Sequence, residues 1–205
     1  MHIAVAGNIG SGKTTLVKLL CEHYGWEPQF EENSNNPYLN DFYQDMNRWS
    51  FNLQIYFLNA RLKKIYEIQK SGKNIVQDRT IYEDAYIFAA NLKDMNLMTE
   101  RDFKSYSELF ELTTSLLNPP DLLIYLQAGV PTLLNQIKKR GISYEQGISP
   151  DYLTKLNLRY DKWIKDYKNE NLLSVDVDNL NFPEKKEDFK VLTDKIDDFL
   201  KNKQQ

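Results

Sequence analysis

The sequence has little of several features that mark special classes of protein. Its 205 residues include one cysteine, Cys21, which excludes an internal disulfide framework and favours a reducing compartment. No apolar run approaches the ~20 residues of a membrane helix, and no charged segment followed by an apolar core indicates a signal peptide. The net charge of −3 argues against polymeric nucleic acid as the main partner. We therefore expect a cytoplasmic protein that binds no membrane.

The remaining composition, 41% apolar and 27% charged residues, is typical of a globular protein. The length favours a single domain over residues 1–205. Short apolar runs alternate with helix-length segments, which predicts an α/β fold with a five-stranded parallel sheet flanked by helices. The predicted strands are 2–6, 28–31, 74–77, 121–126 and 172–175, and a first helix is expected over 14–24.

Residues 7–15 read GNIGSGKTT and match the phosphate-binding pattern G-x4-G-K-[ST]. Glycines let backbone N–H groups converge on phosphate oxygens, and the following helix directs its positive end at the same anion. Lys13 is expected to bridge the β- and γ-phosphates and Thr14 to bind Mg²⁺. A glycine turn without a ligand is the alternative. The nucleotide-binding prediction covers Gly7, Asn8, Ile9, Gly10, Ser11, Gly12, Lys13, Thr14 and Thr15.

The phosphate-binding motif does not identify the acceptor. The N-K-x-D pattern of GTPases is absent, since residues 91–94 read NLKD, and so is the L-S-G-G-Q signature of transporter ATPases. A small chain with a helical middle and a basic segment near residue 140 fits a small-molecule kinase better.

Several further segments carry a resemblance that is more specific than the phosphate motif alone. Along most of its length the chain resembles the deoxyribonucleoside kinases, the family of deoxycytidine, deoxyguanosine and deoxyadenosine kinases, and looks most similar to the short bacterial deoxyadenosine kinase type. The resemblance implies a P-loop kinase fold and transfer of phosphate from ATP to the 5′-hydroxyl of a deoxynucleoside, deoxyadenosine first. The segments are GNI (7–9), FEE (30–32), NPY (36–38), QIY (54–56), DRT (78–80), PDLLIYL (120–126) and KRG (139–141).

Glu31 ends the second predicted strand, and the carboxyl ends of parallel strands face the ligand crevice. A carboxylate there can take the proton of a sugar hydroxyl and so act as general base. The resemblance implies this role for Glu31. Relatives read E-P-V or E-D-V here, so Glu32 stays a rival base, and a solvated carboxylate pair is the alternative to both.

Asp78 and Arg79 follow the third predicted strand at the same edge of the sheet. The resemblance implies that Asp78 binds Mg²⁺ and that Arg79 steadies the transferring phosphoryl group, whereas a structural ion pair is the alternative. Thr80 and Glu83 have the spacing of a capping box. This box would fix the next helix start and direct Asp78 and Arg79 at the phosphate loop.

Between residues 49 and 70, apolar side chains recur at spacings of three and four, which predicts an amphipathic helix. Gln54 and Arg61 fall on the apolar side, where an unpaired polar group costs about 1–3 kcal/mol. Either both bond to nearby backbone, or they face a ligand cavity. The resemblance implies that Gln54 reads the base of the substrate. The apolar stripe consists of Phe51, Ile55, Leu58, Leu62 and Ile65.

The resemblance assigns further substrate contacts. Arg61 and Asp84 match residues that relatives use for bases with an amino group, because an aspartate accepts from an amine but repels a thymine carbonyl. Phe88, one helical turn after Asp84, is expected to stack on the base unless it is an ordinary core residue. Tyr43 and Glu145 match positions that hold the 3′-hydroxyl of the sugar, and otherwise read as surface residues.

Residues 138–140, KKR, end a predicted helix and open a loop, and the functional interpretation is a lid over about 138–149. Basic residues are favoured at helix C-termini in any case, but the resemblance implies that Arg140 closes over the ATP phosphates. Relatives carry two more arginines where this chain has Gln136 and Ile142, so the lid must depend on Arg140 with help from its lysines. Ser149 before Pro150 predicts the next helix start. Asp176 matches a loop over the adenine of ATP, although a surface turn explains it equally well.

Two other functions stay open. A nucleoside monophosphate kinase needs several arginines near Gln54 for the acceptor phosphate, and the sequence offers only Arg48 and Arg61 there. A P-loop ATPase or nucleotide-binding switch would have no small acceptor. The resemblance further implies a homodimer through the long helices.

Overall fold

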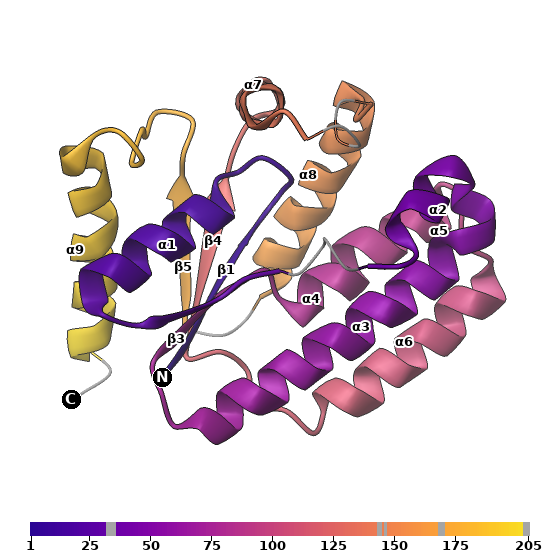
Figure 1. Ribbon diagram of the computed structural model, residues 1–205, viewed down its shortest axis with the longest axis horizontal. Coiled ribbons are helices and arrows are strands. Elements are labelled where there is room, and N and C mark those ends of the chain that lie inside the picture. The colour runs from indigo at the N-terminus through magenta and orange to yellow at the C-terminus, as the bar shows by residue number, and fades with distance from the viewer. Residues whose placement is uncertain (32–35, 143–144, 146, 168–170, 203–205) are drawn as a thin grey trace.

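The computed structural model describes residues 1–31, 36–142, 145, 147–167 and 171–202 (Figure 1). Its centre is a five-stranded parallel sheet with the order β2-β3-β1-β4-β5. The predicted α/β fold is therefore confirmed. The strands are β1 (His2–Gly7), β2 (Glu27–Gln29), β3 (Ile75–Asp78), β4 (Leu122–Gln127) and β5 (Leu172–Asp176).

Helices cover both faces of this sheet (Figure 1). On one side lie α1 (Lys13–Tyr24) and α9 (Lys186–Asn202). On the other lie α3 (Met46–Ser71), α4 (Ile81–Glu83), α6 (Glu100–Thr114) and α8 (Pro150–Asp166). The remaining described helices are α2 (Leu39–Gln44), the π-helix η1 (Asp84–Ala89), α5 (Ala90–Asp94) and α7 (Val130–Arg140). None of the helices in the described part of the chain combines the length and apolar content needed to cross a bilayer.

Strand β1 is buried on both faces, which explains its unbroken apolar run. Ile3 and Val5 pack in one core with α1 and α9, whereas Ala4 and Ala6 pack in another with η1 and α8. The sheet is parallel, and Val5 pairs with Asp78 while Gly7 pairs with Leu126. The carboxyl ends of β1, β3 and β4 therefore meet at one edge, where a ligand crevice is expected.

Strand β2 is shorter than the sequence predicts, and the expectation that it runs to Glu31 is wrong. Its ladder with β3 stops at Gln29. The ammonium of Lys64 donates a hydrogen bond to the carbonyl of Phe30. Glu31 turns toward two arginines instead of continuing the strand. The general-base candidate thus lies two residues beyond the strand end, over the edge of the sheet.

Candidate active site

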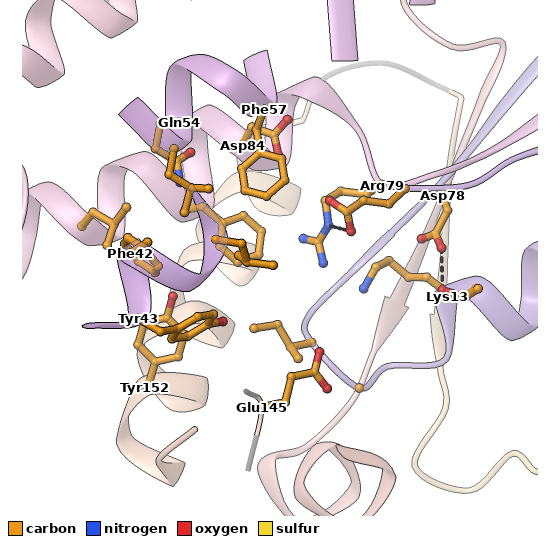
Figure 2. A pocket seen from close by; sticks show the side chains of 18 of the residues that line it. Lys13, Phe42, Tyr43, Gln54, Phe57, Asp78, Arg79, Asp84, Glu145 and Tyr152 are labelled. Atoms are coloured by element: carbon orange, nitrogen blue, oxygen red, sulfur yellow. Dashed lines mark hydrogen bonds and ion pairs between the residues drawn. The ribbon is translucent and has the colours of Figure 1, made fainter. Parts of the chain in front are cut away.

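A cavity at the carboxyl edge of the sheet collects residues from segments that are distant in sequence (Figure 2). Its lining joins the phosphate loop to α2, α3, β3, η1 and α8. Glu31, the general-base candidate, and Gln54, the candidate for base recognition, line the same cavity as Lys13. The predicted residues in the lining are Ile9, Gly10, Lys13, Thr14, Glu31, Tyr43, Gln54, Asp78, Arg79, Asp84, Phe88, Arg140 and Glu145.

The phosphate loop holds a conformation that only glycines permit at two points. Gly10 has φ +85, and a Cβ there would lie 2.7 Å from the carbonyl oxygen of Leu133. Gly7 would bring a Cβ within 2.8 Å of the carbonyl of Leu126. Without these side chains the loop packs directly on its neighbours and leaves its concave side to a ligand.

Lys13 is buried at the start of α1, where its ammonium donates to the carbonyls of Gly7 at 2.8 Å and Asn8 at 2.9 Å. Burial, assisted by the charge of Arg79, lowers the pKa of Lys13 to about 8. The lysine is therefore held by backbone oxygens at the position where the motif predicts phosphate binding.

Other residues of the loop lie outside the cavity lining, and one of them connects the loop to α8. The amide of Asn8 donates to the carbonyl of Leu153 and to Asn157, both on α8. Ser11 is buried, Gly12 has φ +92 and precedes α1, and Thr15 lies in the first turn of that helix. These predicted residues belong to the loop, but they do not line the cavity.

Thr14 and Asp78 form an oxygen-rich pair beside Lys13. The hydroxyl of Thr14 donates to Asp78 Oδ2 at 2.5 Å (Figure 2). Asp78 Oδ1 is buried and has no hydrogen-bond partner among the described residues. A hydroxyl and a carboxylate next to a phosphate site are the ligands that Mg²⁺ uses, so these residues fit the ion.

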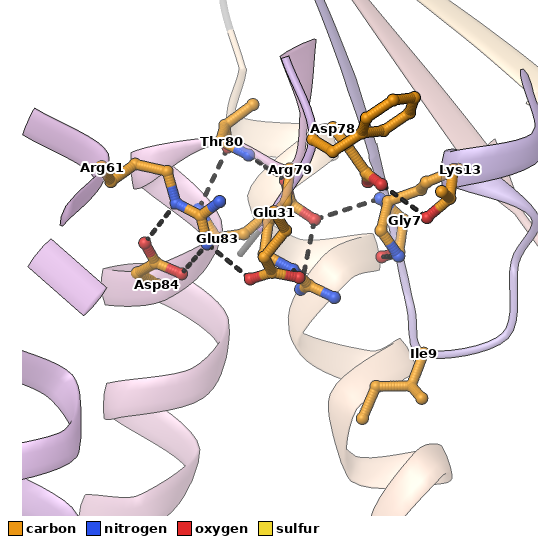
Figure 3. Close-up of polar contacts among 12 residues, drawn as sticks. Gly7, Ile9, Lys13, Glu31, Arg61, Asp78, Arg79, Thr80, Glu83 and Asp84 are labelled. Carbon is orange, nitrogen blue, oxygen red and sulfur yellow. Dashed lines mark hydrogen bonds and ion pairs between the residues drawn. The ribbon is translucent and has the colours of Figure 1, made fainter. Parts of the chain in front are cut away.

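Glu31 lies between two guanidinium groups (Figure 3). Arg61 Nη2 is 2.7 Å from Glu31 Oε1, and Arg79 Nε is 3.1 Å from Glu31 Oε2. Burial alone would raise the pKa of Glu31, but the charges of Arg79 and Arg61 outweigh it and hold this pKa well below its usual range. Glu31 is therefore an ionised carboxylate in the cavity. Its rival, Glu32, lies outside the described residues.

Arg79 has an unusual backbone conformation that sequence patterns did not indicate. Its φ is +68, which is uncommon for a residue with a side chain and is typical of functional sites. The predicted capping box follows at once: Thr80 accepts from Glu83 N–H, and Glu83 accepts from Thr80 N–H at 2.7 Å. The strained residue thus sits between a strand end and a fixed helix start, with its guanidinium directed at Glu31.

Arg61 does not line the cavity, although its two partners do. From α3 it binds Asp84 through Nε at 2.9 Å and through Nη2 at 3.1 Å, and the same Nη2 reaches Glu31. Asp84 is also buried, and burial raises its pKa against the opposing effect of Arg61. One buried guanidinium therefore connects the two carboxylates.

Gln54 lies in the buried stripe of α3, on the apolar side of the helix where the sequence placed it. The buried set is Ser50, Leu53, Gln54, Leu58, Arg61, Ile65 and Ile68, whereas Phe51, Ile55 and Leu62 are only partly buried. Gln54 Oε1 has no hydrogen-bond partner among the described residues. A buried amide oxygen without a partner beside a cavity favours a ligand contact over the backbone alternative.

Four apolar side chains line the cavity together with Gln54, and the sequence did not predict them. They are Phe42 from α2, Leu53 and Phe57 from α3, and Leu92 from α5; Figure 2 shows Phe42 and Phe57. Leu53 and Phe57 are adjacent to Gln54 and one turn away, so helical spacing was an available signal. Phe42 and Leu92 are brought in by tertiary packing, which no local pattern reveals.

Asp84 and Phe88 stand on a π-helix instead of the α-helix that the sequence predicts. A π-turn is rare and is often found at functional sites. Phe88 lines the cavity, and its ring lies 4.6 Å from the guanidinium carbon of Arg79. The ring therefore packs over the guanidinium of Arg79 within the cavity lining.

At the mouth of the cavity, Arg140 forms an ion pair with Glu145. Tyr43 and Glu145 line the same opening, and Tyr152 from α8 joins them without having been predicted. Helix α8 begins as expected, with Ser149 accepting from Tyr152 N–H. Asp176 ends β5 outside the lining and accepts from Asp178 N–H.

Comparison with known proteins gives consistent matches along the chain. The family model described as deoxynucleoside kinase matches residues 3–201. The chain is 39% identical over 196 residues to a deoxyadenosine/deoxycytidine kinase of Bacillus subtilis, covering 95% of this chain and 90% of that protein. It is 39% identical over 189 residues to a deoxyadenosine kinase of Lactobacillus acidophilus, covering 88% and 87% respectively.

A solved structure shows the same architecture. The deoxyadenosine kinase from M. mycoides, with products dCMP and a flexible dCDP bound, superimposes with a TM-score of 0.84 at 30% identity. The match covers 97% of this chain and 100% of that chain.

Proposed function

The chain belongs to the deoxynucleoside kinase family, and we propose that it transfers the γ-phosphoryl group of ATP to the 5′-hydroxyl of a deoxynucleoside. Deoxyadenosine is the first choice, with deoxycytidine and deoxyguanosine as alternatives. The observation that carries the proposal is the shared cavity of Lys13, Glu31 and Gln54. It provides space for a nucleoside between a base-reading amide and a phosphate loop.

At the phosphate end, Lys13 and the loop N–H groups hold the β- and γ-phosphates of ATP. Thr14 and Asp78 would hold Mg²⁺, which supplies positive charge to neutralise the phosphates when it is bound. Arg79 faces the same space and stabilises negative charge on the transferring group. Positioning and charge are thus supplied by residues that the fold already holds in place.

Glu31 accepts the proton of the 5′-hydroxyl. A carboxylate whose pKa is held low is a weak base, but phosphoryl transfer passes through a loose transition state in which the proton leaves late. Position then matters more than base strength, and the two arginines fix the position of Glu31.

At the base end, Gln54 donates to and accepts from the edge of the base, and Phe88 packs on its face. Asp84 accepts from an exocyclic amine, which adenine, cytosine and guanine carry and thymine lacks. Tyr43 and Glu145 hold the 3′-hydroxyl at the mouth of the cavity. Arg140 leaves its pair with Glu145 to close over the ATP phosphates, and Asp176 lies near the adenine of ATP.

A homodimer is part of this proposal. It is supported by a groove between η1, α6 and α8, lined by Tyr82, Tyr86, Phe110 and Trp163, with Tyr86 48% exposed. The single-domain organisation over 1–205, the lid at about 138–149 and the cytoplasmic location stay predictions of the sequence.

The two other functions are less well supported. A nucleoside monophosphate kinase needs arginines around its acceptor phosphate. Arg48 instead is exposed and packs on the ring of Trp49, while Arg61 is occupied by two carboxylates. An ATPase without an acceptor gives no account of the amide oxygen of Gln54, which has no hydrogen-bond partner among the described residues.

One assay distinguishes the three functions. The purified protein is incubated with Mg-ATP and a panel of nucleosides and monophosphates, and new phosphorylated products are followed by chromatography. We expect deoxyadenosine to give dAMP. A product formed only from a monophosphate, or ATP hydrolysis that is unaffected by nucleosides, would overturn the proposal.

A further inference from the structure

Glu83 is a buried carboxylate that the proposed reaction leaves without a role. It is 0% exposed and lies outside the cavity lining. Its Oε2 accepts the Thr80 N–H at 2.7 Å and so completes the capping box (Figure 3). The start of the helix therefore accounts for one of its two oxygens.

The other oxygen, Oε1, contacts groups that the start of the helix does not need. It accepts the Gly7 N–H at 3.1 Å and the Tyr160 hydroxyl at 2.8 Å, and it lies 3.7 Å from Arg79 Nη1. Each of these groups is a donor, as is the Thr80 N–H. Such surroundings fit an ionised carboxyl, which only accepts hydrogen bonds. Glu83 is thus a negative charge that donors from β1, from the segment after β3 and from α8 hold in one place.

A buried carboxylate is costly unless a positive charge compensates it. Among the described residues, the cation that forms an ion pair with Glu83 is Arg79. The Nη1 atom of this arginine is itself buried and has no hydrogen-bond partner in the same part of the chain. A capping box does not require burial, so the position of Glu83 beside this guanidinium needs a further explanation.

Arg79 has two carboxylate partners in the described part of the chain, and the proposed reaction affects them differently. Glu31 Oε2 lies 3.1 Å from Arg79 Nε in the cavity lining, and Glu31 accepts the proton of the 5′-hydroxyl. With that proton Glu31 becomes neutral, so its attraction for Arg79 falls at the stage when Arg79 has to stabilise the transferring phosphoryl group. Glu83 lies outside the cavity and keeps its charge.

We propose that Glu83 is a positioning residue that holds Arg79 in place while Glu31 takes up the proton of the 5′-hydroxyl. This inference rests on the proposed function, which assigns those roles to Glu31 and Arg79. The proton passes from the hydroxyl oxygen to Glu31 as that oxygen bonds to phosphorus and the bond from phosphorus to the leaving ADP oxygen breaks. Glu83 contacts neither reactant, and its charge remains when that of Glu31 is lost.

Glu83→Gln keeps the shape of the side chain and removes its charge. We expect kcat for deoxyadenosine to fall by about 10–100-fold, because misplacement of a catalytic group by about 1 Å can cost 10²-fold. Equilibrium binding of deoxyadenosine, which depends on the base end, should stay within about twofold of the unmodified protein. An unchanged kcat would overturn the inference.

The stability of the variant needs its own control. The new amide has to turn its NH2 group toward the N–H of Gly7 or of Thr80, so the melting temperature should fall as well. Thr99→Ala is the matched control, because Thr99 is exposed and caps α6 by accepting the Asp102 N–H. It should lower the melting temperature and leave kcat unchanged. If Glu83→Gln weakened turnover and deoxyadenosine binding in parallel, its role would be structural only and the inference would fail.

Crystal structures test the same step without turnover. Glu31→Gln imitates the neutral form of Glu31, and Arg79 Nη1 should stay beside Glu83 Oε1 in this variant. In the double variant Glu31→Gln/Glu83→Gln, the guanidinium should leave its present position. A guanidinium that is displaced in Glu31→Gln alone, or one that stays in the double variant, would contradict the proposal. An unmodified protein that forms no dAMP from deoxyadenosine and Mg-ATP would instead refute the proposed function.

Discussion

The two ends of the cavity are built in different ways. The phosphate end consists of a contiguous loop with fixed backbone angles, together with charged groups that have partners before any ligand binds. The base end consists of apolar side chains from three separate helices around one amide oxygen without a partner. The first end is set by local backbone chemistry and the second by packing. Substitutions should accordingly change the rate at one end and nucleoside affinity or choice at the other.

Arg61 is where the two ends meet. It binds Asp84 at the base end and Glu31 at the phosphate end with the same guanidinium. A change at Asp84 therefore frees Arg61 and disturbs Glu31, whereas a change at Gln54 does not. Comparing substitutions at these positions tests how far the two ends are independent.

The largest effect is expected from Glu31→Gln, which keeps the shape of the side chain but removes the proton acceptor. General-base catalysis contributes about 10²–10⁴-fold, so kcat should fall by about three orders of magnitude while deoxynucleoside binding survives. Steady-state kinetics and equilibrium binding measure the two quantities. Glu27→Gln is the control, because Glu27 is an exposed glutamate on β2 that pairs with Lys73. A near-normal kcat for Glu31→Gln would move the general base elsewhere, to Glu32 first.

Gln54→Leu should produce the next largest effect, confined to the base end. The base loses its amide partner, which costs about 1–3 kcal/mol and weakens deoxyadenosine binding about thirtyfold. Mg-ATP binding should not change. Gln69→Leu, at an exposed position on the same helix, controls for the loss of an amide. Weaker ATP binding by Gln54→Leu would show that the two ends are not separable at this residue.

Asp84→Ala should have a smaller but selective effect. The acceptor for an exocyclic amine is lost, so kcat/KM for deoxyadenosine should fall about tenfold more than kcat/KM for thymidine. Because Arg61 loses a partner, kcat should decrease moderately for every substrate. Thymidine serves as the internal control. Equal losses for both nucleosides would remove Asp84 from base recognition and leave it as a support for Arg61.

The phosphate end was largely predictable from sequence, because its chemistry is local. The spacing of Gly7, Gly12 and Lys13 and the capping box of Thr80 and Glu83 specify backbone conformations within a few residues. Alternating strands and helices likewise predicted the parallel sheet, since their order constrains the topology. The exception is the end of β2, where Glu31 leaves the ladder for two arginines that lie far along the chain.

The base end was only partly predictable. Gln54 was recognised as a polar residue on an apolar helix face, but Phe42 and Leu92 reach the cavity through the packing of α2 and α5 against α3. The π-helix that carries Asp84 and Phe88 and the positive φ of Arg79 have no local signature. The pair of Glu83 and Tyr160 joins residues 77 positions apart. Such features depend on tertiary contacts that outweigh local preference.

The smallest effect at neutral pH is expected from protonation of the two buried carboxyls, Asp84 and Glu31. As the pH falls, they should take up protons at different pH values, so that the base end and the phosphate end lose function one after the other. Burial would raise the pKa of Glu31, but Arg79 and Arg61 hold it well below its ordinary value of 4.5. Burial raises the pKa of Asp84 above its ordinary 3.8; the charge of Glu31 adds to this effect, and the two outweigh the opposing effect of Arg61. A carboxyl takes up a proton when the pH falls through its pKa, so Asp84 is protonated before Glu31.

The KM for deoxyadenosine should therefore rise on acidification before kcat falls. Kinetics from pH 7 downward, with circular dichroism at each pH to verify folding, measure the order of the two changes. Equilibrium binding of deoxyadenosine to Glu31→Gln should still weaken on acidification, but at a lower pH than in the unmodified protein, because the charge of Glu31 helps to raise the pKa of Asp84. A kcat that falls first at constant KM would mean that Glu31 takes up a proton before Asp84 does. The two arginines would then not hold Glu31 ionised, contrary to the prediction.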